Sequence, residues 1–163
     1  MALVQKITPN LWFDGNAKEA VDFYTSVFEG SITASTFYPT EGLLDFQQSL
    51  AGKELTIAFE LAGQSFVAIN AGPEFHFTEA ISFSVACKDQ AEIDHYWAKL
   101  SHVPESEQCG WCKDRFGLSW QIVPADMEAL MSKSDGTYNQ AAWQCMMQMK
   151  KIDIAALQAA ESR

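Results

Sequence analysis

The amino-acid sequence predicts an α+β fold in which one unit, a strand followed by a helix and further strands, occurs twice. Residues 11–28 align with residues 83–100, and a shorter similarity relates residues 63–68 to residues 117–122. Each longer segment alternates first and then follows helical periodicity, as expected for a strand leading into an amphipathic helix. The aligned pairs are Leu11 with Phe83, Phe13 with Val85, Val21 with Ile93, Asp22 with Asp94, Tyr24 with Tyr96 and Phe28 with Leu100. Two such units can enclose a shared cavity, so small-molecule binding is the first functional hypothesis.

The elements of the first unit follow from alternation, capping residues and turn residues. Alternating side chains predict a first strand that Gly15 ends. Asn16 and Glu19 have the spacing of a capping box, which predicts a helix that Gly30 ends. Residues rich in β-branched and aromatic types predict three further strands, the last two joined by a turn at Ala62-Gly63. The expected ranges are strands at 5–14, 31–38, 53–61 and 64–71, with the helix at 17–28 and a connection of uncertain form at 39–52.

The second unit repeats this order and is followed by helices. Asp89 and Glu92 repeat the capping arrangement before a helix that reaches Leu100. The expected strands are 78–87, 109–113 and 116–123, with a polar loop at 104–108; helices are expected at 127–131, 139–150 and 152–160. We therefore expect a single domain, residues 1–163, built as module 1 at 1–73, module 2 at 74–124 and a C-terminal helical extension at 125–163.

Composition and charge exclude several functional classes. The formal net charge is -10, and no stripe of Lys and Arg is present that could attract a phosphate backbone, so nucleic acid is not an expected partner. No apolar run of about 18 residues indicates a membrane-spanning helix, and no secretory signal is evident at the N-terminus. The four cysteines, Cys87, Cys109, Cys112 and Cys145, are then expected to be reduced thiols in the cytoplasm.

Several segments of the sequence resemble a known family. They are Asp14 to Ala20 with Phe23-Tyr24, Asp89-Gln90 with Asp94 and Tyr96-Trp97, Cys109 to Gln121, and Met149 to Asp153. These segments resemble the PhnB-like proteins, also called 3-demethylubiquinone-9 3-methyltransferase-like, of the vicinal oxygen chelate (glyoxalase/bleomycin-resistance) superfamily. The resemblance implies two pseudo-symmetric βαβββ modules that form a curved mixed sheet around a cavity, usually in a homodimer.

The resemblance also implies where a divalent metal would bind. The superfamily's metal ligands, His and Glu at four symmetric strand positions, correspond to Thr8, Val67, Ala80 and Gln121 in this sequence. A divalent cation needs imidazole or carboxylate donors, and this set offers one hydroxyl and one amide. We expect no metal and no other cofactor, and we expect Gln121 to act as an orienting hydrogen-bond donor and acceptor.

Strand parity predicts which side chains face the cavity. Each helix should pack on the face that carries Leu11 and Phe13, or Phe83 and Val85, so the alternate residues face the cavity. His76, at the junction of the modules, is either a general base at the cavity mouth or a loop histidine without a task. The predicted ligand-binding residues are Asn10, Trp12, Ser65, His76, Ser82, Ser84, Ser119 and Gln121. This set suits a small, partly polar ligand with a flat portion.

Catalytic residues cannot be assigned from spacing. Glu60, Lys113 and Asp114 are the nearest ionisable residues, but Asp114 precedes Gly117 in a pattern typical of an aspartate that bonds backbone amides in a turn. The spacing of Cys109 and Cys112 matches a redox pair or half a zinc site, yet no helix follows that would lower a thiol pKa and no second ligand pair is present. Packing is the favoured interpretation of both cysteines.

Three functional hypotheses remain open. The first is a small-molecule-binding protein, with or without catalysis, that uses the cavity without the superfamily metal. The second is a metal-dependent lyase or dioxygenase of the glyoxalase type with relocated ligands. The third is the 3-demethylubiquinone-9 3-methyltransferase of the family name, although the sequence lacks the glycine-rich strand-to-helix turn that usually binds S-adenosylmethionine.

Overall fold

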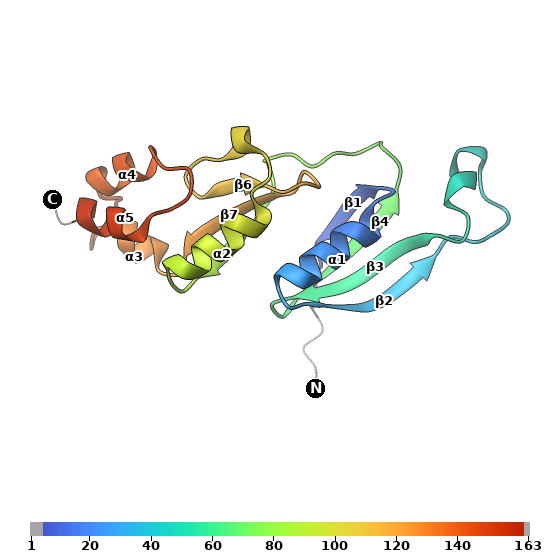
Figure 1. Ribbon diagram of the computed structural model, residues 1–163. Coiled ribbons are helices and arrows are strands. Elements are labelled where there is room, and N and C mark those ends of the chain that lie inside the picture. The colour runs from blue at the N-terminus through green and yellow to red at the C-terminus, as the bar shows by residue number, and fades with distance from the viewer. Residues whose placement is uncertain (1–4, 162–163) are drawn as a thin grey trace. The chain divides into compact units, whose positions relative to one another are not determined.

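The chain forms two compact units, which we describe in turn. The structure is a computed structural model that describes residues 5–161. The first unit is Met1–His76 and the second is Phe77–Arg163. Both combine helices with a β-sheet (Figure 1), which confirms the predicted α+β class. No helix within the described residues is both long and apolar enough to cross a membrane.

In the first unit, one helix covers one face of a four-stranded sheet. The sheet order is β1-β4-β3-β2, with β1 parallel to β4 and the other neighbours antiparallel. The segment between β2 and β3, which contains the short 3-10 helix η1, projects beyond the sheet (Figure 1). The elements are β1 (Asn10–Asp14), α1 (Ala17–Val27), β2 (Ser31–Phe37), η1 (Asp45–Leu50), β3 (Glu54–Leu61) and β4 (Gln64–Ala71).

The core of the first unit lies between α1 and the sheet. Tyr24 of α1 is fully buried, and its ring stacks on Phe59 of β3 at 6.5 Å; Phe59 stacks in turn on Phe66 of β4 at 5.5 Å. Leu11 and Phe13 of β1 are buried on this side, as parity predicts. The opposite face of the sheet therefore has no helix of this unit upon it.

The start of α1 differs from the prediction. The side chain of Asn16 makes no capping hydrogen bond, and its backbone (φ -113°, ψ 20°) is not extended. Instead, the buried side chain of Asn70 on β4 accepts a hydrogen bond from the Ala17 amide at 3.3 Å. The first strand also begins at Asn10, so residues 5–9 lie outside it. A tertiary contact thus replaces the local cap that the spacing of Asn16 and Glu19 predicts.

Strand β2 forms the exposed edge of this sheet. All of its residues are exposed, and two register irregularities interrupt its pairing with β3, between Ile32 and Ala34 and between Thr36 and Phe37. The opposite turn of the sheet, from β3 to β4, agrees with the prediction. Ala62 and Gly63 both have positive φ, 48° and 81°, as a two-residue hairpin of type I′ requires.

In the second unit, α2 packs on a three-stranded sheet and three short helices follow. The sheet order is β5-β7-β6, with β5 parallel to β7 and β6 antiparallel to β7. Asp89 caps α2 as predicted, because its carboxylate accepts a hydrogen bond from the Glu92 amide at 2.9 Å. The elements are β5 (Ser82–Cys87), α2 (Gln90–Leu100), η2 (Pro104–Ser106), β6 (Trp111–Lys113), β7 (Ser119–Pro124), α3 (Met127–Met131), α4 (Gln140–Met146) and α5 (Ile154–Glu161).

The second unit has three strands among its described residues, where a βαβββ module has four. The connection from Leu100 to Trp111 is short and holds only the 3-10 turn η2, whereas the corresponding connection of the first unit contains β2. The parallel pairs also differ in register. Leu11 lies opposite Ala68 in the first unit. Phe83, which aligns with Leu11, lies opposite Trp120, whereas the residue that aligns with Ala68 is Ile122, two positions later. A shift of two keeps every side chain on the same face.

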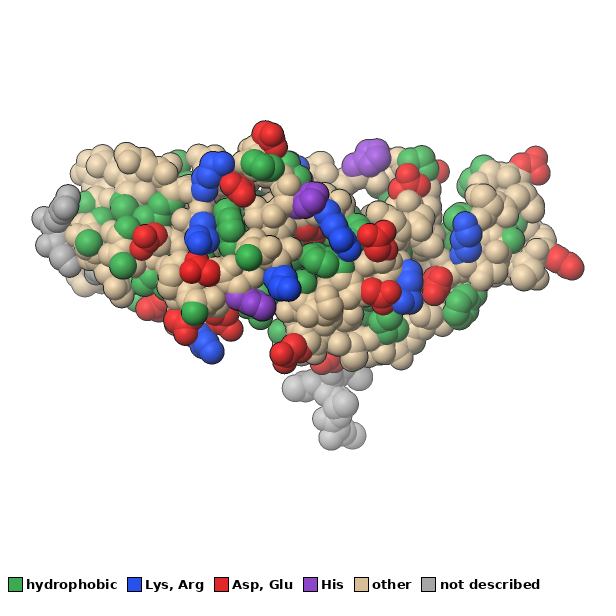
Figure 2. All heavy atoms as spheres, viewed as in Figure 1, with side chains coloured by type: hydrophobic (Ala, Val, Ile, Leu, Met, Phe, Trp, Pro, Cys, Tyr) green, Lys and Arg blue, Asp and Glu red, His purple; other side chains and the backbone are tan. Residues whose placement is uncertain are grey.

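Charged side chains are mixed on the surface of each unit. Figure 2 shows Lys and Arg side chains interspersed with Asp and Glu over the visible face. Several of these residues form ion pairs, namely Lys18 with Asp22, Lys113 with Glu79, Lys150 with Glu107 and Lys151 with Asp94.

A buried carboxylate organises the turn between β6 and β7. Asp114 is 1% exposed, and its Oδ1 accepts hydrogen bonds from the amides of Phe116 (2.8 Å) and Leu118 (3.0 Å). Its Oδ2 accepts a hydrogen bond from the indole N–H of Trp120 at 2.8 Å. Gly117 takes a φ of 88° in the same turn. This confirms the prediction that Asp114 bonds backbone amides.

We predict that Asp114→Asn destabilises the protein by about 2 kcal/mol, because an amide nitrogen cannot accept the indole hydrogen bond and a charged acceptor is lost. Urea unfolding followed by tryptophan fluorescence measures the change. Asp126→Asn is the matched control, since Asp126 is exposed and its side chain makes no capping bond. Equal midpoints for the Asp114 variant and the parent protein would contradict this account.

Candidate functional site

The face of the second sheet opposite α2 carries two cross-strand rows of side chains. In the first row, Ser119 of β7 lies opposite Ser82 of β5 on one side and Lys113 of β6 on the other. In the second row, Gln121 lies between Ser84 and Trp111. We call these six residues, Ser82, Ser84, Trp111, Lys113, Ser119 and Gln121, the polar face.

The other face of this sheet is apolar and packs against α2. The rings of Phe83 and Trp120 lie 5.8 Å apart on that side, next to the buried Cys112. Ile93 and Leu100 of α2 are fully buried. Parity therefore separates an apolar, helix-covered face from a polar one, as the alternation of the sequence predicts.

Ser119 is the most unusual residue of the polar face. It is 1% exposed, and its hydroxyl has no hydrogen-bond partner among residues 5–161. A buried hydroxyl without a partner costs roughly 1–3 kcal/mol, so such groups are rare in folded proteins. A ligand that hydrogen-bonds to the Ser119 oxygen would remove this cost.

Gln121 makes a hydrogen bond across the two rows. Its amide Nε2 donates to the hydroxyl of Ser82 at 2.8 Å. The side chain of Gln121 is half-buried, and that of Ser84 is exposed. The amide is thus held by its neighbour, and the expected role of Gln121 in orienting a ligand stays a prediction.

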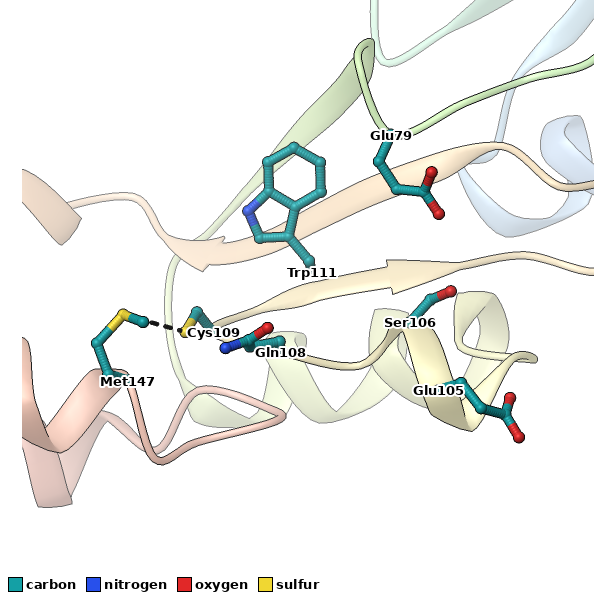
Figure 3. A pocket seen from close by; sticks show the side chains of 7 residues that line it. All are labelled: Glu79, Glu105, Ser106, Gln108, Cys109, Trp111 and Met147. Atoms are coloured by element: carbon teal, nitrogen blue, oxygen red, sulfur yellow. Dashed lines mark hydrogen bonds between the residues drawn. The ribbon is translucent and has the colours of Figure 1, made fainter.

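Lys113 and Trp111 extend the polar face to the edge strand β6. The ammonium group of Lys113 forms an ion pair with Glu79, and the hydrogen bond from Lys113 lowers the pKa of the Glu79 carboxyl below its ordinary value. Trp111 and Glu79 also line a pocket of about 510 Å³, together with Glu105, Ser106, Gln108, Cys109 and Met147. Figure 3 shows Trp111 and Glu79 on one side of this pocket, with Cys109 and Met147 at its far end.

Three predicted residues of the first unit, Asn10, Trp12 and Ser65, lie on the helix-free face of its sheet, whereas His76 lies beyond its last strand. Asn10 is exposed on β1, while Trp12 is half-buried and donates its indole N–H to the Gly72 carbonyl at 2.8 Å. Ser65 lies on β4 with its side chain on the same face, and His76 is exposed at the end of the unit. The predicted role of these residues in ligand binding remains a prediction.

Sequence reasoning places Ser82, Ser84, Ser119 and Gln121 on one face but omits Trp111 and Lys113. The missing step is the register of the β6–β7 hairpin, which sets Lys113 opposite Ser119. The turn from Asp114 to Gly117 is recognisable in the sequence, and counting outward from this turn is the signal that could locate both residues.

The chain does not offer the donors of the superfamily metal. Of the four corresponding positions, Val67 and Ala80 have no donor atom in their side chains, and Thr8 and Gln121 are weak ligands. Residues 5–161 contain no group of three or more His, Cys, Asp and Glu side chains that could hold an ion. The residues therefore do not fit a glyoxalase-type metal at these positions.

The cysteine pair has the properties of packing residues. Cys112 is buried, and its loss of solvent contact raises the pKa of the thiol to about 12. Burial also raises the pKa of Cys109, whose sulfur lies 3.7 Å from the sulfur of Met147. The described cysteines are all free thiols. A raised pKa suppresses the thiolate, which supports packing as the role of the buried Cys112.

Comparison with known proteins identifies the family. The model of the family described as 3-demethylubiquinone-9 3-methyltransferase matches residues 5–123. A solved structure from Bacillus cereus, described as a putative 3-demethylubiquinone-9 3-methyltransferase and PhnB protein, is 35% identical and aligns over 74% of this chain and 100% of its own, with a TM-score of 0.60. The chain belongs to this PhnB-like family.

More distant structures agree on the fold of the PhnB-like chain. Protein PA1353 from Pseudomonas aeruginosa is 20% identical over 73% of this chain and 96% of its own, with a TM-score of 0.53. The fosfomycin resistance protein FosX from Listeria monocytogenes is 13% identical over 82% of this chain and 100% of its own, with a TM-score of 0.51. No curated protein matches the sequence significantly. These two structures agree with the fold that the resemblance implies.

We predict that Ellman's reagent at pH 8 labels the half-buried Cys109 and Cys145 of the native PhnB-like chain, while Cys87 and Cys112 react only after unfolding. Burial raises the pKa of both protected thiols to about 12. Between about pH 9 and pH 12 these thiols ionise in the unfolded chain but not in the folded one, so they lower the free energy of unfolding as pH rises.

Thiol counts in native and denaturing buffer check this prediction. Cys112→Ala is expected to reduce the loss of stability above pH 9, and Cys145→Ala, at a half-buried site, serves as its control. Rapid labelling of Cys112 in the native protein would contradict its assignment as a packing residue.

Proposed function

We propose that the PhnB-like chain binds a small, partly polar metabolite on the polar face of its second unit, without the superfamily metal. The buried hydroxyl of Ser119, which has no partner among residues 5–161, is the observation that carries this proposal. Folding places this hydroxyl away from water at a cost, and a ligand is the group that can compensate it.

The rest of the polar face supports the same role. Gln121 uses its amide nitrogen on Ser82, which leaves its carbonyl oxygen available to a donor on a ligand. Ser84 adds an exposed hydroxyl, and Trp111 adds a half-buried indole that suits a flat group. Few, fixed polar groups beside an aromatic surface are typical of metabolite sites.

The helix-free face of the first sheet, taken by itself, carries a separate set of candidate ligand-binding residues. The indole N–H of Trp12 is already bonded to Gly72, and Phe75 packs edge-on at 4.9 Å, so the indole is held in one orientation. Asn10 and Ser65 contribute polar atoms on the same face, and we include His76 as a ligand-binding residue for its exposed imidazole. Rigid aromatic side chains lose little entropy when they bind a ligand.

We also propose that the protein is cytoplasmic and forms a homodimer. Four free cysteines are consistent with a reducing compartment. The edge strand β2, with every residue exposed, and the exposed apolar side chains of Phe37, Leu44 and Phe46 near it support contact with a second copy.

A second candidate function is methyl transfer, which the family description and the name of the Bacillus cereus protein both state. S-adenosylmethionine would need a site for its charged amino acid and its adenine. Of the glycines with positive φ, Gly15 lies between β1 and α1, Gly63 and Gly117 lie in hairpin turns, and the others lie in loops. None of these turns leads from one parallel strand into a helix with a glycine-rich sequence.

We predict that Ser119→Ala leaves the midpoint of thermal unfolding unchanged or raises it, because the substitution removes an uncompensated hydroxyl. The same change should at least halve the thermal shift caused by whichever compound of a small-metabolite panel stabilises the parent protein. Ser134→Ala, in an exposed turn of the same unit, is the control and should alter neither value.

Two outcomes of this experiment would count against the proposal. A clear loss of stability in the Ser119 variant would mean that its hydroxyl already has a partner. An undiminished ligand shift in that variant would place the ligand elsewhere.

We predict that the purified protein carries far less than one equivalent of Ni, Zn, Fe or Mn, because the positions that hold the superfamily metal lack imidazole and carboxylate donors. Elemental analysis by mass spectrometry measures this, and prolonged dialysis against EDTA should leave the unfolding temperature unchanged. A stoichiometric metal would favour the metal-dependent lyase or dioxygenase instead.

We predict no heat of binding when S-adenosylmethionine is titrated into the protein at high micromolar concentration. Isothermal titration calorimetry makes this measurement, and S-adenosylhomocysteine provides a second test with the methyl group removed. A saturable signal with either compound would establish the methyltransferase alternative.

A further inference from the structure

The polar face contains a cation that is mostly withdrawn from solvent. The side chain of Lys113 is 21% exposed, and the register places it directly opposite Ser119, whose hydroxyl has no partner within residues 5–161. An ammonium group in such a setting requires an anion close to it, because its loss of hydration is otherwise uncompensated.

The anion that now occupies this position is supplied by the chain itself. Glu79 forms the ion pair with Lys113, but its side chain is 59% exposed, and it lies outside any helix or strand, just before β5. The pair is therefore asymmetric. Lys113 would lose much by separation, whereas a carboxylate on an exposed segment would return to water.

We propose that Glu79 is a displaceable internal anion, and that the ligand of the polar face carries a carboxylate that takes its place on Lys113. This inference rests on the proposed function and specifies the class of ligand. In the bound state the carboxylate would accept hydrogen bonds from the Lys113 ammonium and from the hydroxyl of Ser119, so the ammonium would exchange one anionic partner for another and the hydroxyl would gain a partner.

The position of Trp111 defines the rest of the ligand. Trp111 and Lys113 lie two residues apart on the same face of β6, which corresponds to about 7 Å along a strand. Trp111 and Glu79 line the pocket of about 510 Å³ (Figure 3), and Lys113, which does not itself line this pocket, is joined to it by the ion pair with Glu79. A flat ring joined directly to a carboxylate matches this spacing, so the expected class is a small aromatic or heteroaromatic acid.

The charges of the pocket permit this assignment. The chain has a formal net charge of -10, which repels anions at long range, but this repulsion is screened beyond about 8 Å at physiological ionic strength. Glu79 and Glu105 both line the pocket, and their two carboxylates would by themselves attract a cationic ligand. The existing ion pair favours an anionic ligand. Glu79 is already paired with Lys113, so a cationic ligand would have to displace a lysine whose backbone is fixed on β6.

Benzoate, benzamide and benzylamine test the proposal as a matched set of probes. Calorimetric titration of the whole 163-residue chain should show benzoate binding about tenfold more tightly than benzamide, the neutral analogue of the same shape. Glu79→Gln should tighten benzoate several-fold and leave benzamide unchanged. Lys113→Met should abolish the preference for benzoate. Asp94→Asn, which breaks the exposed pair with Lys151 elsewhere in this unit, is the control for a general change of charge.

The outcomes separate this inference from the proposed function. Equal affinities for benzoate and benzamide, no binding of benzoate at millimolar concentration, or weaker benzoate binding in Glu79→Gln would each overturn the displacement by a carboxylate. Tighter binding of benzylamine would overturn it too, in favour of a cationic ligand. If a metabolite still binds in a manner that depends on Ser119, the proposed function stands without this inference. Circular dichroism of Glu79→Gln and Lys113→Met verifies that both variants are folded.

Discussion

The hydrogen bonds of Asp114 are the interaction on which the candidate site depends. One carboxylate holds the amides of the β6–β7 turn and the indole of Trp120, so the turn is fixed to the apolar side of the sheet. The register of β6 against β7 follows from this turn. That register is what brings Lys113 opposite Ser119 on the other side of the sheet, although Asp114 itself bonds to Trp120 on the apolar side.

The repetition of the strand–helix unit explains why such a face exists in both halves of the chain. In each unit the first strand lies parallel to the last, and the intervening helix covers one side. Period-two alternation then leaves the other side of each sheet without a helix. The two-residue difference in register between the units changes which residues are opposite one another, but it does not change which residues face the helix.

The sequence is informative wherever a local pattern decides the structure. The turn at Ala62-Gly63, the cap of Asp89 and the turn bonds of Asp114 depend on residues close in the chain, and all three are predictable. The cap of α1 is not, because Asn70 reaches it from a distant strand. The row containing Lys113 depends on strand register, and the lack of a partner for Ser119 within residues 5–161 depends on burial; composition and spacing determine neither.

The exposed edge strand β2 matters for the self-association of the protein. Its outer backbone groups pair with no strand of this sheet, and it lacks the lysines and prolines that usually discourage edge-to-edge joining of sheets. Two irregularities in its register protect it from pairing with a strand of another chain, because they distort the regular edge that such pairing needs. A substitution that straightened this edge would therefore promote fibril-like association of newly made chains before it affected any binding property.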